Sequence, residues 1–554
     1  MKLLNIKRTL LLSATAAFGG FIVSAVPPMP GFINVAQPDG TTIEARIMGD
    51  HEFHYYELRD GSVMMADPSD GFIKPVTMHK LETLRAADSA RREAARQATA
   101  TRTAPATIKN DFPTTGTVKG LIVLAEFQDV KFQPGSTKEY FSRKLNQVGY
   151  QGEETAGSAV DYFLEQSYGR FTPEFDVVGP ITLPKNRADY GQNEDLVNLF
   201  RDAALLADSD CGVNFADYDI DNDHFVDFFF VIFAGHGQAQ GGPAESVWPA
   251  MKDVSDYIYD MFDDKYLGVA ACSCELKNGE GTDLDGVGTV CHEFSHILGL
   301  PDIYDAQNTG GHGMGHYDMM CYGPYNGDMR VPSGYTAMDK FTLGWITPRV
   351  LDSPQKDVTL LDIASNEDCI FIVNPNNENE YYTLENRQLK GFDSALPGHG
   401  LVISYVNYNR TAWKKNTVNS LLSGYEHVSI MPADNSRDLN VKGSLNYEAG
   451  DPFPGTRKNT SFTDTSSPKA VWKASGAETP VGMAITNIRE SDDGVITFDF
   501  MADQAGVSEI EMDEVFSGNA EFFTLQGIRI EKGDLRPGIY IMRDASGNVR
   551  KVRL

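Results

Sequence analysis

The stretch CHEFSHILGLPDIYD, residues 291–305, carries two histidines four positions apart, His292 and His296, with Glu293 directly after the first. On a helix, positions four apart lie one above the other on one face, so both imidazoles reach one metal ion. A zinc ion held in this way lowers the pKa of a bound water to about 7, and an adjacent carboxylate accepts the proton. The spacing therefore predicts a catalytic zinc site with Glu293 as general base.

The third ligand must come from the chain after the second histidine. Gly299 stands three residues beyond His296, where glycine lets the chain leave a helix in a left-handed conformation. The chain then turns beneath the metal, and Asp302 is placed to supply an oxygen ligand. Asp305 is the alternative, one step farther out. Glycine and aspartate at these spacings make the motif far more specific than HExxH alone.

A tight turn is expected in YDMMCYG, residues 317–323. A methionine beneath the metal in such a turn is part of the metzincin pattern, and Met320 is the candidate, with Met319 as the alternate. By itself, such a methionine is ordinary core filling. Tyr322 is the candidate hydrogen-bond donor to the oxyanion of the tetrahedral intermediate, and a structural tyrosine is the other interpretation.

A second metal signal lies in DYDIDNDHFVD. Four aspartates repel one another at this density unless a cation gathers them, and calcium takes six to eight oxygen ligands. The sequence predicts a calcium loop that uses the backbone carbonyl of Phe225 and the carboxylates of Asp219, Asp221, Asp223 and Asp227. A solvated acidic turn is the alternative.

The composition sets limits on the function. The net charge of −29 repels nucleic acid, so DNA and RNA binding are set aside. The hydrophobic content of 41% is enough for proper cores, and 554 residues imply three or more folded units. Six cysteines permit disulfides in an exported protein, but Cys272 and Cys274 share one face of a strand and are not expected to pair.

Residues 1–25 have the three parts of a secretory signal peptide: a basic start, an apolar run and small residues before a cut expected after Ala25. A membrane anchor is the alternative, but the apolar run is short and interrupted by glycine. No later stretch is long and apolar enough to span a bilayer. Residues 26–110 are a candidate propeptide, with β-like runs, a helix over 79–99 and a linker exposed to proteolysis, and activation is expected within 97–115. A small N-terminal domain is the alternative.

The elements that must position the metal site lie in residues 111–348, where apolar strands and helices interleave and predict a catalytic unit of mixed α+β structure. The HExxH motif falls on a helix that ends at a glycine. Residues 349–502 show short alternating strands at the spacing of a β-sandwich. Residues 511–554 are again β-like and predict a small C-terminal β domain.

HEFSHILGLPDIYD followed by YDMMCYG resembles the immune inhibitor A-type metalloproteases, secreted zinc endopeptidases related to the metzincins. SAVDYFLEQSYGRF, DIDNDHFVDFFFVIFAGHG and the later DPFPG also look like family segments, and the resemblance covers roughly residues 30–500. It implies a zymogen with zinc held by His292, His296 and Asp302, and with Glu293 as general base. The Cys-Tyr-Gly after Met320 departs from the Ser-Ser-Gly type of the family, which leaves the role of Tyr322 open.

The propeptide region contains no cysteine, so latency through a cysteine ligand is excluded, and an aspartate of that region is the alternative. The tail FFTLQGIRIEKGDLRPGIYIMRDASGNVRKVRL resembles the C-terminal sorting domains of type IX secretion substrates. That resemblance implies export by the type IX machinery and removal of the tail; a plain terminal β domain is the alternative.

The sequence thus favours a secreted or cell-surface zinc endopeptidase, stabilised by calcium, made as a zymogen and acting on proteins or peptides. A different hypothesis is a cell-surface β-rich binding protein with a silent protease unit, against which the intact His292, Glu293 and His296 argue. A zinc hydrolase acting on a non-peptide amide is the third.

Overall fold

The computed structural model describes residues 23–51, 53–100, 112–152, 155–191, 196–307, 309–421, 424–436, 445–474, 476–502, 508–509, 520–524, 527–536, 538–543 and 549–553. Most of the predicted signal peptide and much of the predicted activation segment lie outside these residues.

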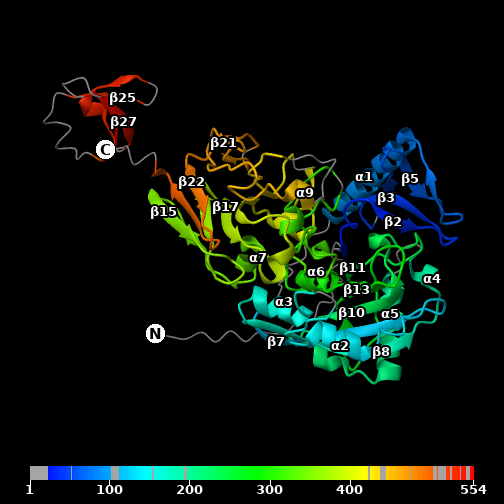
Figure 1. Cartoon of the computed structure of the whole chain (residues 1–554). Coiled ribbons are helices and arrows are strands. Elements are labelled where there is room, and N and C mark those ends of the chain that lie inside the picture. Colours follow the sequence, from blue (N-terminus) through cyan, green and yellow to red (C-terminus); the bar gives the residue numbers. More distant parts are fainter. Residues whose placement is uncertain are drawn as a thin grey trace, which may run out of the picture.

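The N-terminal region is a five-stranded antiparallel sheet in which neighbours in sequence are neighbours in space (Figure 1). Its elements are β2 (Ile33–Ala36), β3 (Thr42–Gly49), β4 (His54–Glu57), β5 (Val63–Ala66), β6 (Ile73–Pro75) and the following helix α1 (Met78–Ala100). The short β-like runs and the helix expected here are confirmed. The sheet packs against the next unit, because Val35, Ile47 and Tyr56 belong to the same hydrophobic cluster as the central sheet.

The central sheet has six strands. In spatial order they are β1 (Val23–Ala25), β11 (Ala250–Asp253), β13 (Val269–Leu276), β10 (Phe229–His236), β7 (Gly116–Glu126) and β8 (Phe171–Thr182). The last four run parallel, as interleaved helices and strands require. β11 is antiparallel to β13, and β1 pairs antiparallel with the outer side of β11.

Both faces of this sheet are covered, so its strands are continuously apolar rather than alternating. Ile122 and Leu124 of β7 join the cluster on one face, and Leu121 and Val123 join the cluster on the other. The first face carries helices α2 (Lys138–Asn146), α3 (Ala159–Gln166) and α6 (Gly288–Ile297). The second face carries α5 (Leu196–Cys211) and the N-terminal sheet. Smaller elements of this region are α4 (Arg187–Gly191), β9 (Phe225–Val226), β12 (Tyr266–Leu267) and α7 (Ala337–Thr342).

Two further sheets follow. The five-stranded one is β14 (Arg349–Val350), β16 (Ile370–Asn374), β17 (Asn377–Arg387), β18 (Gly400–Asn407) and β19 (Val428–Ile430). The three-stranded one is β15 (Gln355–Leu360), β23 (Ile496–Phe500) and β22 (Ile485–Glu490). One hydrophobic cluster contains residues of both sheets, so they enclose a common core. Shorter elements here are α8 (Arg410–Lys414), α9 (Leu445–Glu448), β20 (Val471–Trp472) and β21 (Thr479–Pro480).

Packing crosses the boundary expected at residue 348. Val402 and Val406 of β18 belong to the same cluster as Phe294 of the motif helix and Met320 of the expected turn. The β-rich region therefore supports the motif helix directly.

The last sheet has the order β24 (Ser508–Glu509), β28 (Val549–Arg553), β27 (Ile539–Arg543), β25 (Glu521–Phe523) and β26 (Arg529–Ile530). It has a small hydrophobic cluster of its own and lies apart from the other sheets (Figure 1).

Two further observations bear on the sequence predictions. None of the helices in the described part of the chain is long and apolar enough to cross a bilayer. All six cysteines are free, five of them buried, and Cys272 and Cys274 are unpaired on one strand as expected.

Candidate metal centre and catalytic cleft

The HExxH motif lies on α6, all ten residues of which are buried. Phe294 anchors the helix, because its ring packs edge-on against Phe228 and Phe163 at centroid distances of 4.7 and 5.1 Å. The helix ends where glycine was expected to end it. Gly299 has φ of 99°, and its N–H donates to the carbonyl of His296 at 2.9 Å.

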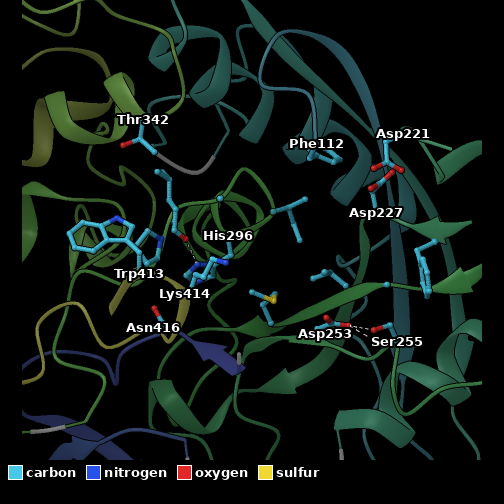
Figure 2. Close-up of a pocket in the computed structure, with 18 of the residues that line it drawn as sticks. Phe112, Asp221, Asp227, Asp253, Ser255, His296, Thr342, Trp413, Lys414 and Asn416 are labelled. Atoms are coloured by element: carbon cyan, nitrogen blue, oxygen red, sulfur yellow. Dashed lines mark hydrogen bonds between the residues drawn. The ribbon is translucent and has the colours of Figure 1, made fainter. Parts of the chain in front are cut away.

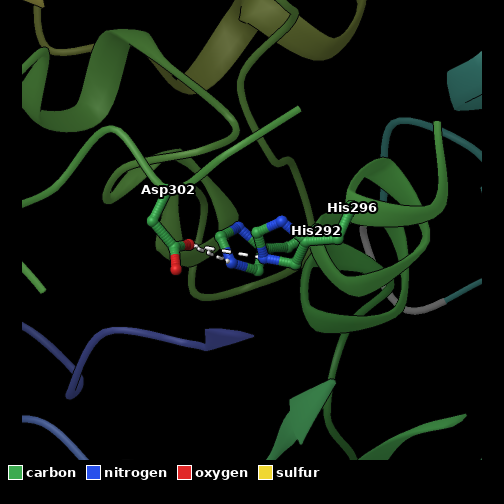
Figure 3. A group of neighbouring side chains, drawn as sticks. All are labelled: His292, His296 and Asp302. Atoms are coloured by element: carbon green, nitrogen blue, oxygen red, sulfur yellow. Dashed lines mark ion pairs between the residues drawn. The ribbon is translucent and has the colours of Figure 1, made fainter. Parts of the chain in front are cut away.

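The structure brings together the two histidines and the aspartate that follows the turn (Figure 3). Oδ1 of Asp302 lies 3.2 Å from Nε2 of His292 and 3.4 Å from Nε2 of His296. All three side chains are almost fully buried. Ligand atoms about 2 Å from one tetrahedral zinc ion lie about 3.3 Å apart, so these separations fit such an ion.

Hydrogen bonds at the back of each imidazole fix its orientation. Nδ1 of His292 lies 2.8 Å from the carbonyl oxygen of Met319, and Nδ1 of His296 lies 2.8 Å from that of Leu300. A proton on each Nδ1 leaves the lone pair of each Nε2 facing the carboxylate oxygen. Two lone pairs and an anionic oxygen repel at this distance, and a cation between them removes the repulsion. The donor set therefore fits a metal ion of the zinc type.

The two candidate aspartates have different surroundings. Asp302 is held by Asn416, which accepts from its backbone N–H at 2.8 Å and donates to its Oδ2, so that Oδ1 faces the histidines. Asp305 instead accepts from the backbone N–H groups of Gly310 and Gly311 at 2.7 and 2.9 Å and shapes the next loop. No local pattern in the sequence pointed to Asn416, which lies more than a hundred residues downstream.

Glu293 follows the first histidine and is fully buried. Burial raises the pKa of this carboxyl group well above its ordinary value, and the charge of Asp302 raises it further. The nearby backbone N–H of Val26 opposes this increase in the pKa. A buried carboxyl group with a raised pKa suits a group that accepts and returns a proton.

The expected turn lies directly behind the histidines. Asp318 accepts from the backbone N–H of Met320 at 2.8 Å, and the carbonyl of Met320 accepts from Ile303 at 2.7 Å. Met319 supplies the carbonyl that orients His292. Tyr322 lies against the ring of His316, with ring centroids 5.9 Å apart. The special roles of Met320 and Tyr322 remain predictions.

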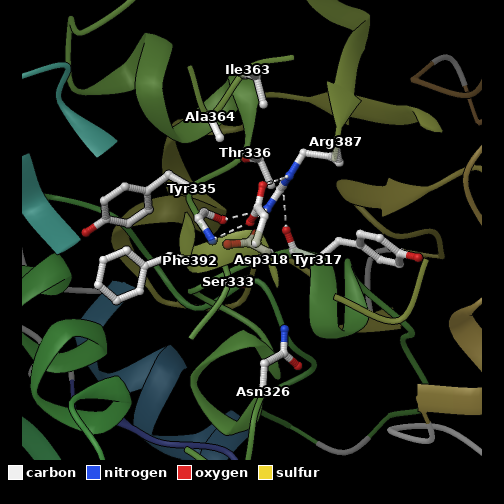
Figure 4. Close-up of polar contacts among 12 residues, drawn as sticks. Tyr317, Asp318, Asn326, Ser333, Tyr335, Thr336, Ile363, Ala364, Arg387 and Phe392 are labelled. Atoms are coloured by element: carbon white, nitrogen blue, oxygen red, sulfur yellow. Dashed lines mark hydrogen bonds and ion pairs between the residues drawn. The ribbon is translucent and has the colours of Figure 1, made fainter. Parts of the chain in front are cut away.

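A buried arginine braces this turn from the β-rich region (Figure 4). Arg387 of β17 donates to the carbonyl oxygens of Tyr317 and Gly334 at 2.9 and 3.1 Å. Its charge is balanced by Asp393 at 2.6 Å and by Glu385 at 3.1 Å. The turn behind the metal centre is therefore held by residues far along the chain.

The N-terminal segment packs against the motif helix and β11, near Glu293. Ser24 and Ala25 are in register with Met251 and Ala250 of β11. The hydroxyl of Tyr304 donates to the carbonyl of Ala25, and that of Tyr325 donates to the carbonyl of Pro27. These contacts were not predicted from the sequence, and they join the first part of the chain to residues about 280 and 300 positions away.

A cavity of about 710 Å³ opens beside the second histidine (Figure 2). His296, Met251 and Trp413 contribute to its walls. One side carries the carboxylates of Asp221, Asp227 and Asp253, and another carries Arg410 and Lys414. It is large enough to receive side chains of a peptide lying along the cleft.

The aspartate loop forms one wall of this cavity. Carboxylate oxygens of Asp219, Asp221 and Asp227 lie within 4.8 Å of one another. Asp223 is outside that group and accepts from the backbone N–H of Phe225 at 2.8 Å. Lys265 lies 2.5 Å from Asp219 and supplies positive charge to the loop. Burial and the neighbouring carboxylates raise the pKa of Asp227 to about 6.

Comparison with known proteins adds to this geometry. Residues 119–345 match the model of the immune inhibitor A peptidase M6 catalytic domain. Immune inhibitor A of Bacillus thuringiensis subsp. alesti is 27% identical over 275 residues, which cover 40% of this chain and 39% of that protein. The pre-pro-metalloprotease PrtV of Vibrio cholerae serotype O1 is 25% identical over 231 residues, which cover 36% of this chain and 24% of that protein.

The matched region contains α6, both histidines and Asp302. This part of the chain is therefore a catalytic domain of the metalloendopeptidase type. The chain spans well under half the length of both relatives, so the activity of the whole protein is a separate question.

Proposed function

We propose that the protein is a secreted zinc endopeptidase made as a zymogen. The observation that carries the proposal is the convergence of Nε2 of His292, Nε2 of His296 and Oδ1 of Asp302 within a region that matches a metallopeptidase catalytic domain. His292, His296 and Asp302 would hold the zinc ion. When bound, zinc supplies Lewis acidity, which polarises a carbonyl group and lowers the pKa of water.

The protein's own groups then manage the proton. Glu293 takes a proton from the attacking water at its carboxylate and passes it to the amine that leaves. Its burial excludes bulk water from this exchange. Met320 is proposed to lie beneath the metal and Tyr322 to assist the oxyanion, as the sequence suggested.

Latency is proposed to come from the N-terminal segment. Residues 26–29 stay with the chain after a cut behind Ala25 and continue the path of the strand that pairs with β11. Trp248, Tyr325 and the backbone of Ala239 hold them as they would hold an extended peptide. A peptide already bound there excludes a substrate. One relative is named a pre-pro-metalloprotease, which agrees with synthesis as a precursor. Removal of residues 26–110 after loss of the signal peptide 1–25 would open the cleft.

The remaining domain assignments are part of the same proposal: a catalytic domain over 111–348, a β-sandwich over 349–502 and a sorting domain over 511–554. The sorting domain would direct export through type IX secretion machinery to the cell surface or the medium. Proteins or peptides would be the substrates.

The aspartate loop is proposed to bind calcium through Asp219, Asp221, Asp223, Asp227 and the carbonyl of Phe225. Burial and, to a smaller extent, repulsion from the neighbouring carboxylates raise the pKa of Asp227, and a cation there would relieve the repulsion. Calcium chelation should lower the melting temperature of the wild-type protein, and an unchanged melting temperature would remove calcium from the proposal.

The test of the main proposal compares the wild type with Glu293→Gln. Both proteins are matured from the full chain, and bound zinc and casein cleavage are measured for each. We expect both to bind one zinc ion and the variant to lose about 10²–10⁴-fold in kcat. If both bind zinc and neither cleaves casein or smaller amides after removal of the N-terminal region, the proposal fails. Absence of zinc from both would favour the cell-surface binding protein instead.

A further inference from the structure

The N-terminal segment is held mainly through its backbone. Successive carbonyl oxygens each receive a side-chain donor: Ala25 from the hydroxyl of Tyr304, Val26 from the indole N–H of Trp248 at 3.1 Å, and Pro27 from the hydroxyl of Tyr325. Farther along, the N–H of Met29 donates to the carbonyl of Ala239 at 2.8 Å. Together with the pairing to β11, these bonds form a continuous track for an extended chain.

One peptide group on this track has a special position. The carbonyl of the Ala25–Val26 bond accepts from Tyr304, and the nitrogen of the same bond belongs to Val26, whose backbone lies near the carboxylate of Glu293. Hydrolysis of a peptide bond requires a donor at the carbonyl oxygen, where negative charge develops, and a proton source at the nitrogen that leaves. Tyr304 and Glu293 stand at those two positions.

The two tyrosines are built into the elements that form the metal centre. Tyr304 follows Asp302 by two residues and is 4% exposed. Tyr325 ends the short helix η4 (Gly323–Tyr325), which packs against α6. The packing is close: a Cβ at Gly288 would lie 2.2 Å from the carbonyl oxygen of Pro324. Both hydroxyls are therefore fixed relative to the histidines rather than carried by a free loop.

We propose that Tyr304 and Tyr325 bind the backbone of peptide substrates along the track now occupied by residues 25–29, with the Tyr304 hydroxyl on the carbonyl oxygen of the bond that is cleaved. The inference rests on the proposed endopeptidase function and assigns two residues that the motif did not contain. Tyr304 is a catalytic residue in this scheme, and Tyr325 is a binding residue for the carbonyl two positions farther on.

The step is ordinary hydrolysis. The oxygen of water forms a bond to the carbonyl carbon, and the C–N bond breaks. One proton of the water passes through Glu293 to the leaving nitrogen, and the other is lost as the new acid ionises. Tyr304 keeps its proton and donates a hydrogen bond that strengthens as the carbonyl oxygen gains charge. Because the donors contact only backbone atoms, the track accepts peptides of varied sequence.

The kinetic test uses enzyme matured from the full chain and three Tyr→Phe variants of residues in the site. Tyr304→Phe should lower kcat by about 10²-fold or more with little change in KM, since removal of an oxyanion donor has this effect. Tyr325→Phe should raise KM by about 5-fold with a smaller effect on kcat. Tyr322→Phe tests the competing assignment, because Tyr322 is the other candidate hydrogen-bond donor to the oxyanion. A large loss of kcat in Tyr322→Phe, with none in Tyr304→Phe, would overturn the assignment.

Tyr382→Phe is the matched control. Its buried hydroxyl donates to the carbonyl of Val471 at 2.6 Å, far along the chain from the metal centre. The control should lose a similar amount of stability and keep kcat and KM. If Tyr304→Phe changes only the melting temperature, as the control does, Tyr304 is structural and the proposal is wrong.

A second readout does not depend on activity. Hydrogen exchange is measured at residues 23–30 in the full chain with the leader retained. Tyr304→Phe and Tyr325→Phe should speed exchange of this segment, whereas Tyr382→Phe should not. If the wild type cleaves no peptide, the proposed function and the catalytic role of Tyr304 fail together, and exchange still decides whether the hydroxyls bind a backbone. Unchanged exchange in both variants would refute the track itself.

Discussion

At the residue scale, the metal centre depends on a side chain that the HExxH motif does not contain. Asn416 holds Asp302 at both its backbone N–H and its Oδ2 and so aims Oδ1 at the two histidines. Partners of this kind orient a ligand without touching the metal, and their loss typically weakens metal binding 10- to 100-fold.

Asn416→Ala should therefore weaken zinc binding by about 10- to 100-fold, measured by competition with a chelator of known affinity. Asn386→Ala is the control, because Asn386 is also buried and donates to the carbonyl oxygens of Leu360 and Gly494. The control should lose stability and keep its zinc affinity. If the wild type and Asn416→Ala bind zinc with equal affinity, Asn416 is not needed to orient Asp302.

Also at this scale, the motif helix could be predicted almost completely. Local geometry accounts for the histidine spacing, for the glycine that ends the helix and for the choice of Asp302 over Asp305. Asp302 is the residue found beside both imidazoles. Asn416 and the tyrosines that hold the N-terminal segment could not be predicted, because no local pattern links positions more than a hundred residues apart.

At the element scale, β17 reaches behind the metal centre through one buried charge. Arg387 is fully buried, is paired with Asp393 and Glu385, and binds the carbonyl oxygen of Tyr317 at the start of the turn that supports His292. Breaking such a pair leaves uncompensated charge in the interior, which is strongly destabilising.

Arg387→Met should lower the free energy of unfolding by about 3–5 kcal/mol and reduce activity by displacing the turn. Arg349→Met is the matched control, since Arg349 also pairs with an aspartate, Asp368 at 2.8 Å, but is 47% exposed. The control should change stability by less than about 1 kcal/mol. Denaturant unfolding measures the free energy of unfolding of both variants. Similar small losses in the two variants would contradict a bracing role for Arg387.

Helix α3 contributes a pH-dependent contact between the catalytic region and the loop after β17. Glu165 accepts from the backbone N–H of Phe392 at 3.2 Å, and burial, together with the charge of Asp393, raises its pKa from 4.5 to about 7. Between those values the folded state binds more protons than the unfolded state. Stability from this group must therefore fall as pH rises through that window.

The melting temperature of the wild type should fall between about pH 5 and pH 8 as Glu165 ionises. Glu165→Gln should make this fall smaller, because glutamine does not ionise. Glu174→Gln is the control at an exposed position, and it should leave the pH dependence as in the wild type. A slope unchanged in Glu165→Gln would show that this carboxyl group does not contribute to the dependence.

At the scale of the whole molecule, the catalytic region and the sheet that follows it pack against each other, whereas the C-terminal sheet packs separately. The cluster around α6 runs from Phe112 to Ile430, so the catalytic region and the following sheet share a core. Among the residues that the structure describes, the C-terminal sheet forms a separate small cluster of Phe522, Leu535, Met542 and Val552.

Deletion of residues 503–554 should therefore leave the melting temperature within about 2 °C and kcat/KM unchanged, measured on the purified protein. Truncation at residue 348 is the contrasting variant, since it exposes the shared core, and it should not fold. A large loss of stability after the C-terminal deletion would show that the last sheet supports the rest of the molecule.

The sequence by itself determined the local features: the motif helix and its end, the apolar strands of the central sheet, the short N-terminal strands with the helix after them, and the acidic loop. These follow from periodicity, turn residues and ligand spacing, which act over a few residues. Only the tertiary structure decided which distant groups meet. It placed residues 23–29 on the edge of β11, Asn416 on Asp302 and Arg387 behind the turn. Such contacts depend on how whole elements pack, and packing of separate elements has no signature in a short stretch of chain.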